Sequence, residues 1–218
     1  VTIYLIVGQT RTLAGYTLNQ SLIFFLTFNV IDTITQLLFR DVYRFRPQIL
    51  NGYFDYVLLK PMNTLFKALL GGADPLDLVM LLPFLCLLGY FISFAATTFI
   101  SGIIYIILIF NALLIAASFH IFVLALGILT TEIDHAIMMY RDFTSLARFP
   151  VDIYREPMRA FVTFVIPIGV MMTFPPKALF GLLSFPLIIT ALVLGVTAVV
   201  MSIKFWQFAL TKYTSASS

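Results

Sequence analysis

The sequence predicts an all-α integral membrane protein, and three observations lead to this fold class. Hydrophobic residues make up 61% of the 218 residues and charged residues only 11%, whereas soluble domains carry about 25% charged residues. The apolar residues form long unbroken runs, near the length of about 20 residues that a spanning helix needs. Membrane β-barrels are instead signalled by short segments of alternating hydrophobicity. The chain is therefore expected to cross a bilayer several times as helices.

The apolar runs define five complete spans and one partial span. Residues 1–7 look like the end of an apolar helix whose start is missing. We therefore expect a single transmembrane domain over residues 1–218, a bundle of six transmembrane helices of which the first is truncated here. The complete spans are expected at residues 21–38, 78–99, 102–129, 160–174 and 182–203.

The run at residues 160–174 is too short for an ordinary span. A helix of that length rises about 22 Å, against a hydrocarbon core of about 30 Å, and Pro167 interrupts it. Either the helix begins deeper, at residues 157–159, or the stretch Pro175–Ser184 re-enters the bilayer from the outer side. Non-helical backbone at that depth must be shielded by protein or line a cavity.

Basic residues are divided unequally between the loops of this arrangement. All but Arg11 and Lys177 of the 13 basic residues fall in or beside residues 40–77, residues 130–159 and the C-terminal region. Cytoplasmic loops carry the excess of Lys and Arg. We therefore expect these three regions, the C-terminus included, on the cytoplasmic side, and Lys177 outside.

The cytoplasmic segment 40–77 contains a candidate amphipathic helix. Apolar and aromatic residues recur there at helical spacing, with a flexible glycine at the entry and a proline as the stop. Such a helix either lies in the headgroup layer or docks a cytoplasmic partner. An acid at position 55 favours docking, because a headgroup helix gains from apolar area and basic charge. The residues assigned to docking are Gly52, Tyr53, Asp55, Tyr56, Leu59, Lys60 and Pro61.

The same run carries a family resemblance. Gly-Tyr-Phe-Asp-Tyr-Val-Leu-Leu-Lys-Pro, from Gly52 to Pro61, resembles a signature of permease subunits of bacterial type-2 ABC exporters. The run Ala147–Tyr154, the Ile166-Pro167 pair and the Pro175-Pro176 break resemble a second block of that family. The similarity covers nearly the whole chain in order and spacing.

The resemblance implies a function and a set of partners. Such permeases cross the bacterial plasma (inner) membrane six times, with a re-entrant pair of short helices before the last span. They pair with a second permease copy or a paralogue and recruit two ABC ATPase subunits, which bind the ATP and Mg. The first cytoplasmic loop, residues 40–77 here, carries the coupling helix that touches the ATPase. The chain is thereby expected to be the membrane subunit of an ATP-driven exporter, with lipid and protein partners and no nucleic acid.

A polar stripe interrupts the span at residues 21–38. Asn29, Asp32 and Gln36 fall on one helix face, with Arg40 near its end. Ionisable residues inside membrane helices usually face a bundle interior or an aqueous cavity. The stripe is either a lining of the transport path or a seam of interhelical hydrogen bonds, and the sequence leaves both open.

Other chemistry is not indicated. The sequence contains no Gly-x-x-x-x-Gly-Lys-Ser/Thr phosphate loop, so we expect no cofactor on this chain and no ATP hydrolysis by it. Glu132, Asp134 and His135 lack a second cluster with ligand spacing, so a metal site is not expected. The single cysteine, Cys86, lies in an apolar run and rules out an internal disulfide.

Two other functions remain as alternatives. An intramembrane lipid-modifying enzyme would need clustered acids or a His/Ser constellation at one membrane depth, and only residues 132–135 come near. A secondary transporter should show internal repeats with helices broken at corresponding positions, and no convincing repeat is present. The transported substrate is not indicated by the sequence.

Overall fold

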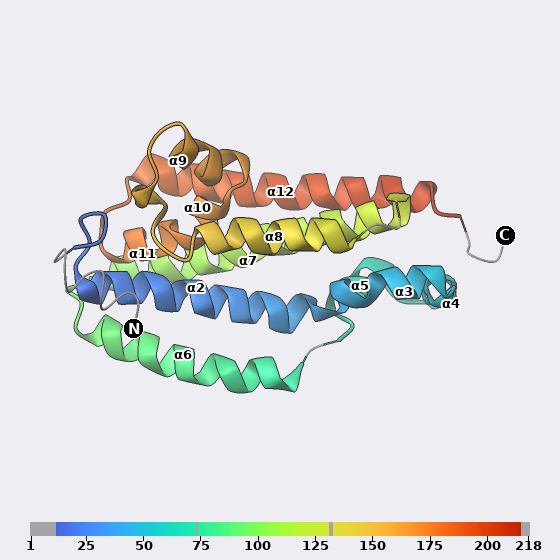
Figure 1. Cartoon of the computed structure of the whole chain (residues 1–218), viewed down its shortest axis with the longest axis horizontal. Coiled ribbons are helices and arrows are strands. Elements are labelled where there is room, and N and C mark those ends of the chain that lie inside the picture. Colours follow the sequence, from blue (N-terminus) through green and yellow to red (C-terminus); the bar gives the residue numbers. More distant parts are fainter. Residues whose placement is uncertain (1–11, 73, 131–132, 215–218) are drawn as a thin grey trace.

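The computed structural model describes residues 12–72, 74–130 and 133–214, and within them the fold is entirely helical. Four helices are long and apolar enough to cross a membrane, once the short helices that extend the first are included. They run along the length of the bundle in Figure 1, with α6 and α12 at its two edges. The predicted partial span at residues 1–7 lies outside the described residues. The long helices are α2 (Leu18–Phe39), α6 (Pro75–Ser93), α7 (Phe99–Thr130) and α12 (Phe185–Thr211).

Local capping sets where two of these helices begin. Thr17 caps α2 through its side chain, which accepts a hydrogen bond from the backbone of Gln20, while the Gln20 side chain accepts one from the backbone of Thr17. Asp74 caps α6 by accepting a hydrogen bond from the backbone N–H of Leu76, and Pro75 occupies the first helical turn, where its missing N–H costs nothing. This cap explains why α6 starts before the predicted residue 78.

The α7–α12 pair forms the centre of the bundle. The Asn111 side chain donates a hydrogen bond of 2.9 Å to the carbonyl oxygen of Ala191 on α12, and the bond is buried. Gly195 lies against Asn111 with no room for a larger residue. Small residues at such a crossing let two membrane helices approach closely.

A group of short elements gathers at the end of α2. Figure 1 shows α3, α4 and α5 together at the end of the bundle where α12 ends. Their helical stretches are separated by turns at Asn51-Gly52 and at Lys60–Asn63. The elements are η1 (Arg40–Arg44), α3 (Phe45–Leu50), α4 (Tyr53–Leu59) and α5 (Thr64–Leu70).

The polar segment after α7 is not a loop at one end of the bundle. It contains α8 (Asp134–Leu146). Asp134 bonds to Arg46, beyond the C-terminal end of α2, at 2.7 Å. Asp152 accepts a hydrogen bond of 2.9 Å from the hydroxyl of Tyr16, before the N-terminal end of α2. Residues 134–152 therefore travel the length of α2, which is about 33 Å at 1.5 Å per residue.

This course corrects the predicted topology. Lys177 donates to Asp152 at 2.7 Å, and two groups in contact cannot lie on opposite sides of a bilayer. The prediction that all of residues 130–159 share one side, opposite Lys177, is wrong. Arg155 and Arg159 therefore no longer count among the basic residues at the α4 end of the bundle. The error has a physical cause, because α8 is short and carries charges, so no apolar run marks it.

Residues 160–174 do not form one helix. The chain passes through short turns, broken at Pro167, and packs them against α7. Phe180, at the end of this stretch, contacts the ring of Phe24 near the start of α2, with ring centroids 5.9 Å apart. The segment from Asp152 to Phe180 thus begins and ends at the same end of the bundle, near the start of α2. Its elements are η2 (Val151–Ile153), α9 (Met158–Ala160), η3 (Phe161–Val165, a π-turn), α10 (Ile168–Met172) and α11 (Phe174–Leu179).

Cysteine labelling tests the corrected course. In a Cys86→Ser background, which removes the exposed native thiol, we expect Arg155→Cys and Leu182→Cys to react with an impermeant maleimide from the same side of the membrane. Lys60→Cys should react only from the other side. If Arg155→Cys and Lys60→Cys react from the same side, the topology first predicted, with residues 130–159 as one loop on the side of Lys60, is correct.

Candidate functional site

The helix α4 begins and ends as its sequence predicts. Gly52 adopts φ +69° at its start, a left-handed conformation that glycine takes at no steric cost. After Leu59 the backbone of Lys60 turns to an extended conformation, as the residue before a proline prefers. The short helix is therefore held between two fixed turns.

Phe54 anchors α4 to the rest of the protein. Its side chain is fully buried and meets the rings of Phe45, Trp206 and Tyr213 at centroid distances of 5.0, 6.2 and 5.2 Å. Edge-to-face contacts of this kind add to the energy of burial. These rings come from α3, from α12 and from the residues just after α12. The cluster thus joins α4 to the C-terminal end of α12.

The opposite face of α4 is exposed. Tyr53, Tyr56 and Leu59 are 47%, 65% and 82% exposed, and Lys60 and Pro61 beside them are also exposed. Tyr53 and Tyr56 thus lie opposite the buried Phe54 and Val57, which form the actual inner face. Aromatic side chains on a fixed backbone are the usual centre of protein interfaces.

Asp55 contacts the residues that follow α12. The hydroxyl of Tyr213 donates a hydrogen bond of 2.9 Å to Asp55 Oδ1. Burial of the phenol, and then this hydrogen bond, raise the pKa of Tyr213 to about 12. The acid that favoured a docking role in the sequence therefore has an internal structural role as well.

A polar cavity lies between α2 and the α8 segment. Its volume is about 440 Å3, and Asp32 and Gln36 from α2 face Arg141 and Arg148 across it. The Gln36 amide donates to Asp32 Oδ2 at 3.0 Å. Two members of the predicted polar stripe thus line a cavity that also receives arginines from the α8 segment.

The other two polar residues near this stripe point elsewhere. The Asn29 amide donates at 2.7 Å to the backbone carbonyl of Phe25 within its own helix. Arg40 bonds to Asp74 and Asp77 at 2.8 and 3.3 Å, tying the end of α2 to the start of α6. Sequence reasoning overlooked two cavity residues, Arg141 on α8 and Arg148 in the turn just after it.

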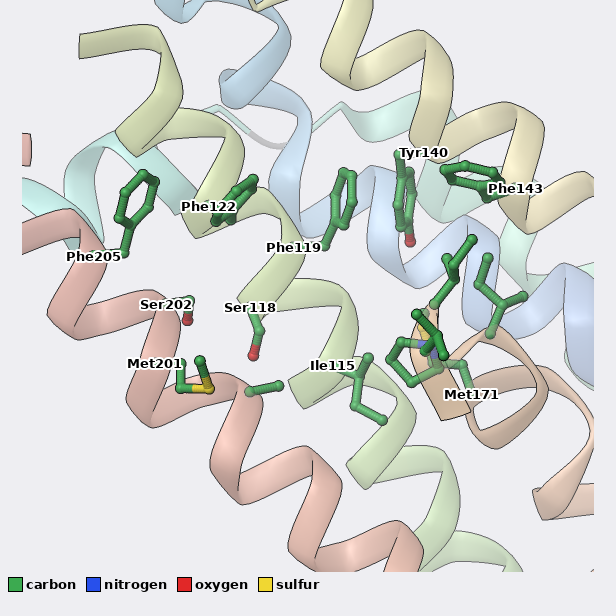
Figure 2. A pocket seen from close by; sticks show the side chains of 15 residues that line it. Ile115, Ser118, Phe119, Phe122, Tyr140, Phe143, Met171, Met201, Ser202 and Phe205 are labelled. Atoms are coloured by element: carbon green, nitrogen blue, oxygen red, sulfur yellow. The ribbon is translucent and has the colours of Figure 1, made fainter. Parts of the chain in front are cut away.

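A second cavity lies on the other side of α8 and is almost wholly apolar. Its volume is about 480 Å3. Figure 2 shows Ser118 of α7 and Ser202 of α12 among the lining residues, and a row of rings that includes Phe119 and Tyr140. Tyr140 borders both cavities. This lining suits apolar groups better than polar solutes.

No metal centre forms among the described residues, where no three His, Cys, Asp or Glu side chains gather. Asp134 is instead paired with Arg46, and Glu132 lies outside the described residues. His120 is buried, with Nδ1 at 2.8 Å from the carbonyl oxygen of Ala116 in its own helix.

A bundle of apolar helices, two cavities within it and a short helix with an exposed aromatic face at one end fit a multi-pass membrane transport permease. Comparison with protein families agrees: the family described as ABC-2 family transporter protein matches residues 1–217. The chain belongs to this family. No curated protein and no solved structure matches the chain.

Proposed function

We propose that the chain is the membrane subunit of an ATP-driven exporter, which forms the substrate path and couples through α4 to separate ABC ATPase subunits. The carrying observation is the division of α4 into a buried anchor, Phe54, and an exposed aromatic face, Tyr53 and Tyr56. A helix whose buried face is packed against α12 and whose exposed face is aromatic can transmit a movement of a bound partner to α12.

The proposed complex contains two permease chains, identical or paralogous, and two ATPases that carry the ATP and Mg. Family membership supports association with ABC ATPases in general. The contacts of Asp152 with Tyr16 and Lys177 support a segment between Asp152 and Lys177 that returns to the same end of the bundle, which differs from the re-entrant stretch Pro175–Ser184 expected from the sequence.

We propose that the α4 end and the C-terminus face the cytoplasm of a bacterial inner membrane. Tyr213 contacts Asp55, so both regions lie at one end. That end still holds most of the basic residues after the correction, among them Arg44, Arg46 and Lys60, as cytoplasmic loops do.

Removal of one exposed ring tests the coupling role. Tyr56→Ala is expected to weaken ATPase co-purification by about tenfold or more, since truncation of an aromatic interface centre costs about 2 kcal/mol. Tyr90→Ala is the matched control, because Tyr90 is a similarly exposed ring (58%) on the apolar helix α6. Co-purification and transport-linked hydrolysis in liposomes are the measurements. Full retention of partner and coupling in Tyr56→Ala would reduce α4 to a membrane-surface helix.

A further inference from the structure

Arg148 is an exposed residue that borders the polar cavity at the level of the middle of α2. Its guanidinium stands 5.9 Å above the ring of Phe28, which is midway along α2. Among the residues that the structure describes, none of the salt bridges involves Arg148 or Arg141. A charged residue at such depth is expensive and normally faces water or a partner. The polar cavity gives access to water, and Asp32 attracts both arginines across it without forming a salt bridge to either, so one carboxylate faces two cations.

A smaller cavity continues this lining toward the α4 end. It measures about 180 Å3 and is bordered by Gln36, Tyr43 and Arg141, which also border the larger cavity, and by Arg40 and Arg44. Four arginines therefore follow one path from the end of α2 to its midpoint. Arg40 is already paired with Asp74 and Asp77. Asp32 and Asp142 oppose the other three arginines within the two cavities, so the lining keeps a small excess of positive charge.

We propose that this path between α2 and α8, with Arg141 and Arg148 as its binding residues, receives an anionic group of the phosphate or carboxylate class. The inference rests on the proposed transport function and names the substrate class for it. Guanidinium groups stay protonated and present planar donor pairs that match these anions. Such charge-assisted bonds would offset part of the cost of holding two arginines at this depth.

Asp32 has a defined part in this site. Its carboxylate is held by Gln36 and faces the same cavity as the two arginines. It repels an entering anion and offsets part of the positive charge of the lining. Removal of this charge alone should therefore strengthen anion binding, and removal of either arginine should weaken it.

Equilibrium binding of radiolabelled dodecyl phosphate to the full-length protein in maltoside micelles is the test. Wild type is expected to bind the probe saturably and to bind dodecyltrimethylammonium, with the same tail and opposite charge, far more weakly. Arg141→Gln and Arg148→Gln should each lower the affinity by about tenfold or more, the loss of one charge-assisted hydrogen bond. Asp32→Asn should raise it. Inorganic phosphate as competitor distinguishes a free anion, which displaces the probe, from a lipid headgroup, which it does not.

Arg46→Gln is the matched control. Arg46 borders neither cavity and its side chain is 45% exposed, so the same loss of charge should leave binding unchanged. Equal binding of the cationic probe, unchanged affinity in both cavity variants, or a fall in Asp32→Asn would overturn the proposal. The measurement uses neither ATP nor an ATPase, so its failure leaves the coupling role of α4 standing, and failure of coupling leaves this result intact.

Discussion

Gly195→Ala is expected to destabilise the protein by about 1–3 kcal/mol, because an added methyl group overpacks a filled crossing. A Cβ at Gly195 would overlap Oδ1 of Asn111 and lie 2.8 Å from its Cγ. Asn111 is 3% exposed and its amide is bonded to Ala191. The amide can make room only by giving up a hydrogen bond where no water replaces it. Thermal unfolding in detergent measures the loss.

Two further variants make this prediction specific. Gly89→Ala on α6 is the control, since its Cβ would meet nothing within 4 Å, and it should be neutral or slightly stabilising. In an Asn111→Ala background the cost of Gly195→Ala should shrink, because the clashing amide is gone. If Gly195→Ala destabilises the wild type and the Asn111→Ala variant equally, the added methyl group is accommodated by residues other than Asn111 and the prediction is wrong.

The long apolar helices could be predicted from the sequence because the bilayer requires an apolar surface wherever a helix meets lipid. The predicted spans at residues 21–38, 102–129 and 182–203 each fall on one observed helix, though α12 runs on to Thr211. The last turns of α12 contact Phe45 and Phe54 through Trp206. Because these contacts are distant in sequence, the residues around Trp206 alone could not predict where α12 ends.

The α8 helix shows why hydropathy alone fails. Ile137, Tyr140 and Thr144 are its buried positions, while Arg141 and Asp142 line the polar cavity. A helix with one face on protein and one on a hydrated cavity needs no apolar run. The charges that appeared to mark a solvated loop are the same charges that build the candidate site.

The extent of α4 was predictable from the sequence, but its orientation was not. Gly52 and Pro61 signal its ends through backbone chemistry that acts locally. Which ring turns inward depends on Trp206 and Tyr213, more than a hundred residues away in the chain. For the same reason the hydrogen bond from Tyr213 to Asp55 could not be read from the pattern around Asp55.

Phe54→Ala is expected to have the largest effect on α4, about 3–5 kcal/mol, the usual cost of removing a buried phenylalanine ring. Phe54 is fully buried and holds α4 against Phe45, Trp206 and Tyr213. Loss of the ring removes the contacts that join α4 to α12, so this helix should open locally before the bundle does. Amide hydrogen exchange over residues 53–59 should accelerate by about a hundredfold or more.

Tyr53→Ala separates anchoring from docking. Tyr53 precedes Phe54 on the same helix and is 47% exposed, so its truncation should leave exchange in residues 53–59 nearly unchanged while weakening ATPase binding. Phe54→Leu, which keeps an apolar side chain in the cluster, should fall between wild type and Phe54→Ala. A bound ATPase can move α12 only through a helix that is attached to it, so Phe54→Ala should also uncouple hydrolysis from transport. Slow exchange and full coupling in Phe54→Ala would mean that α4 is held by other contacts and that the aromatic cluster does not transmit the motion.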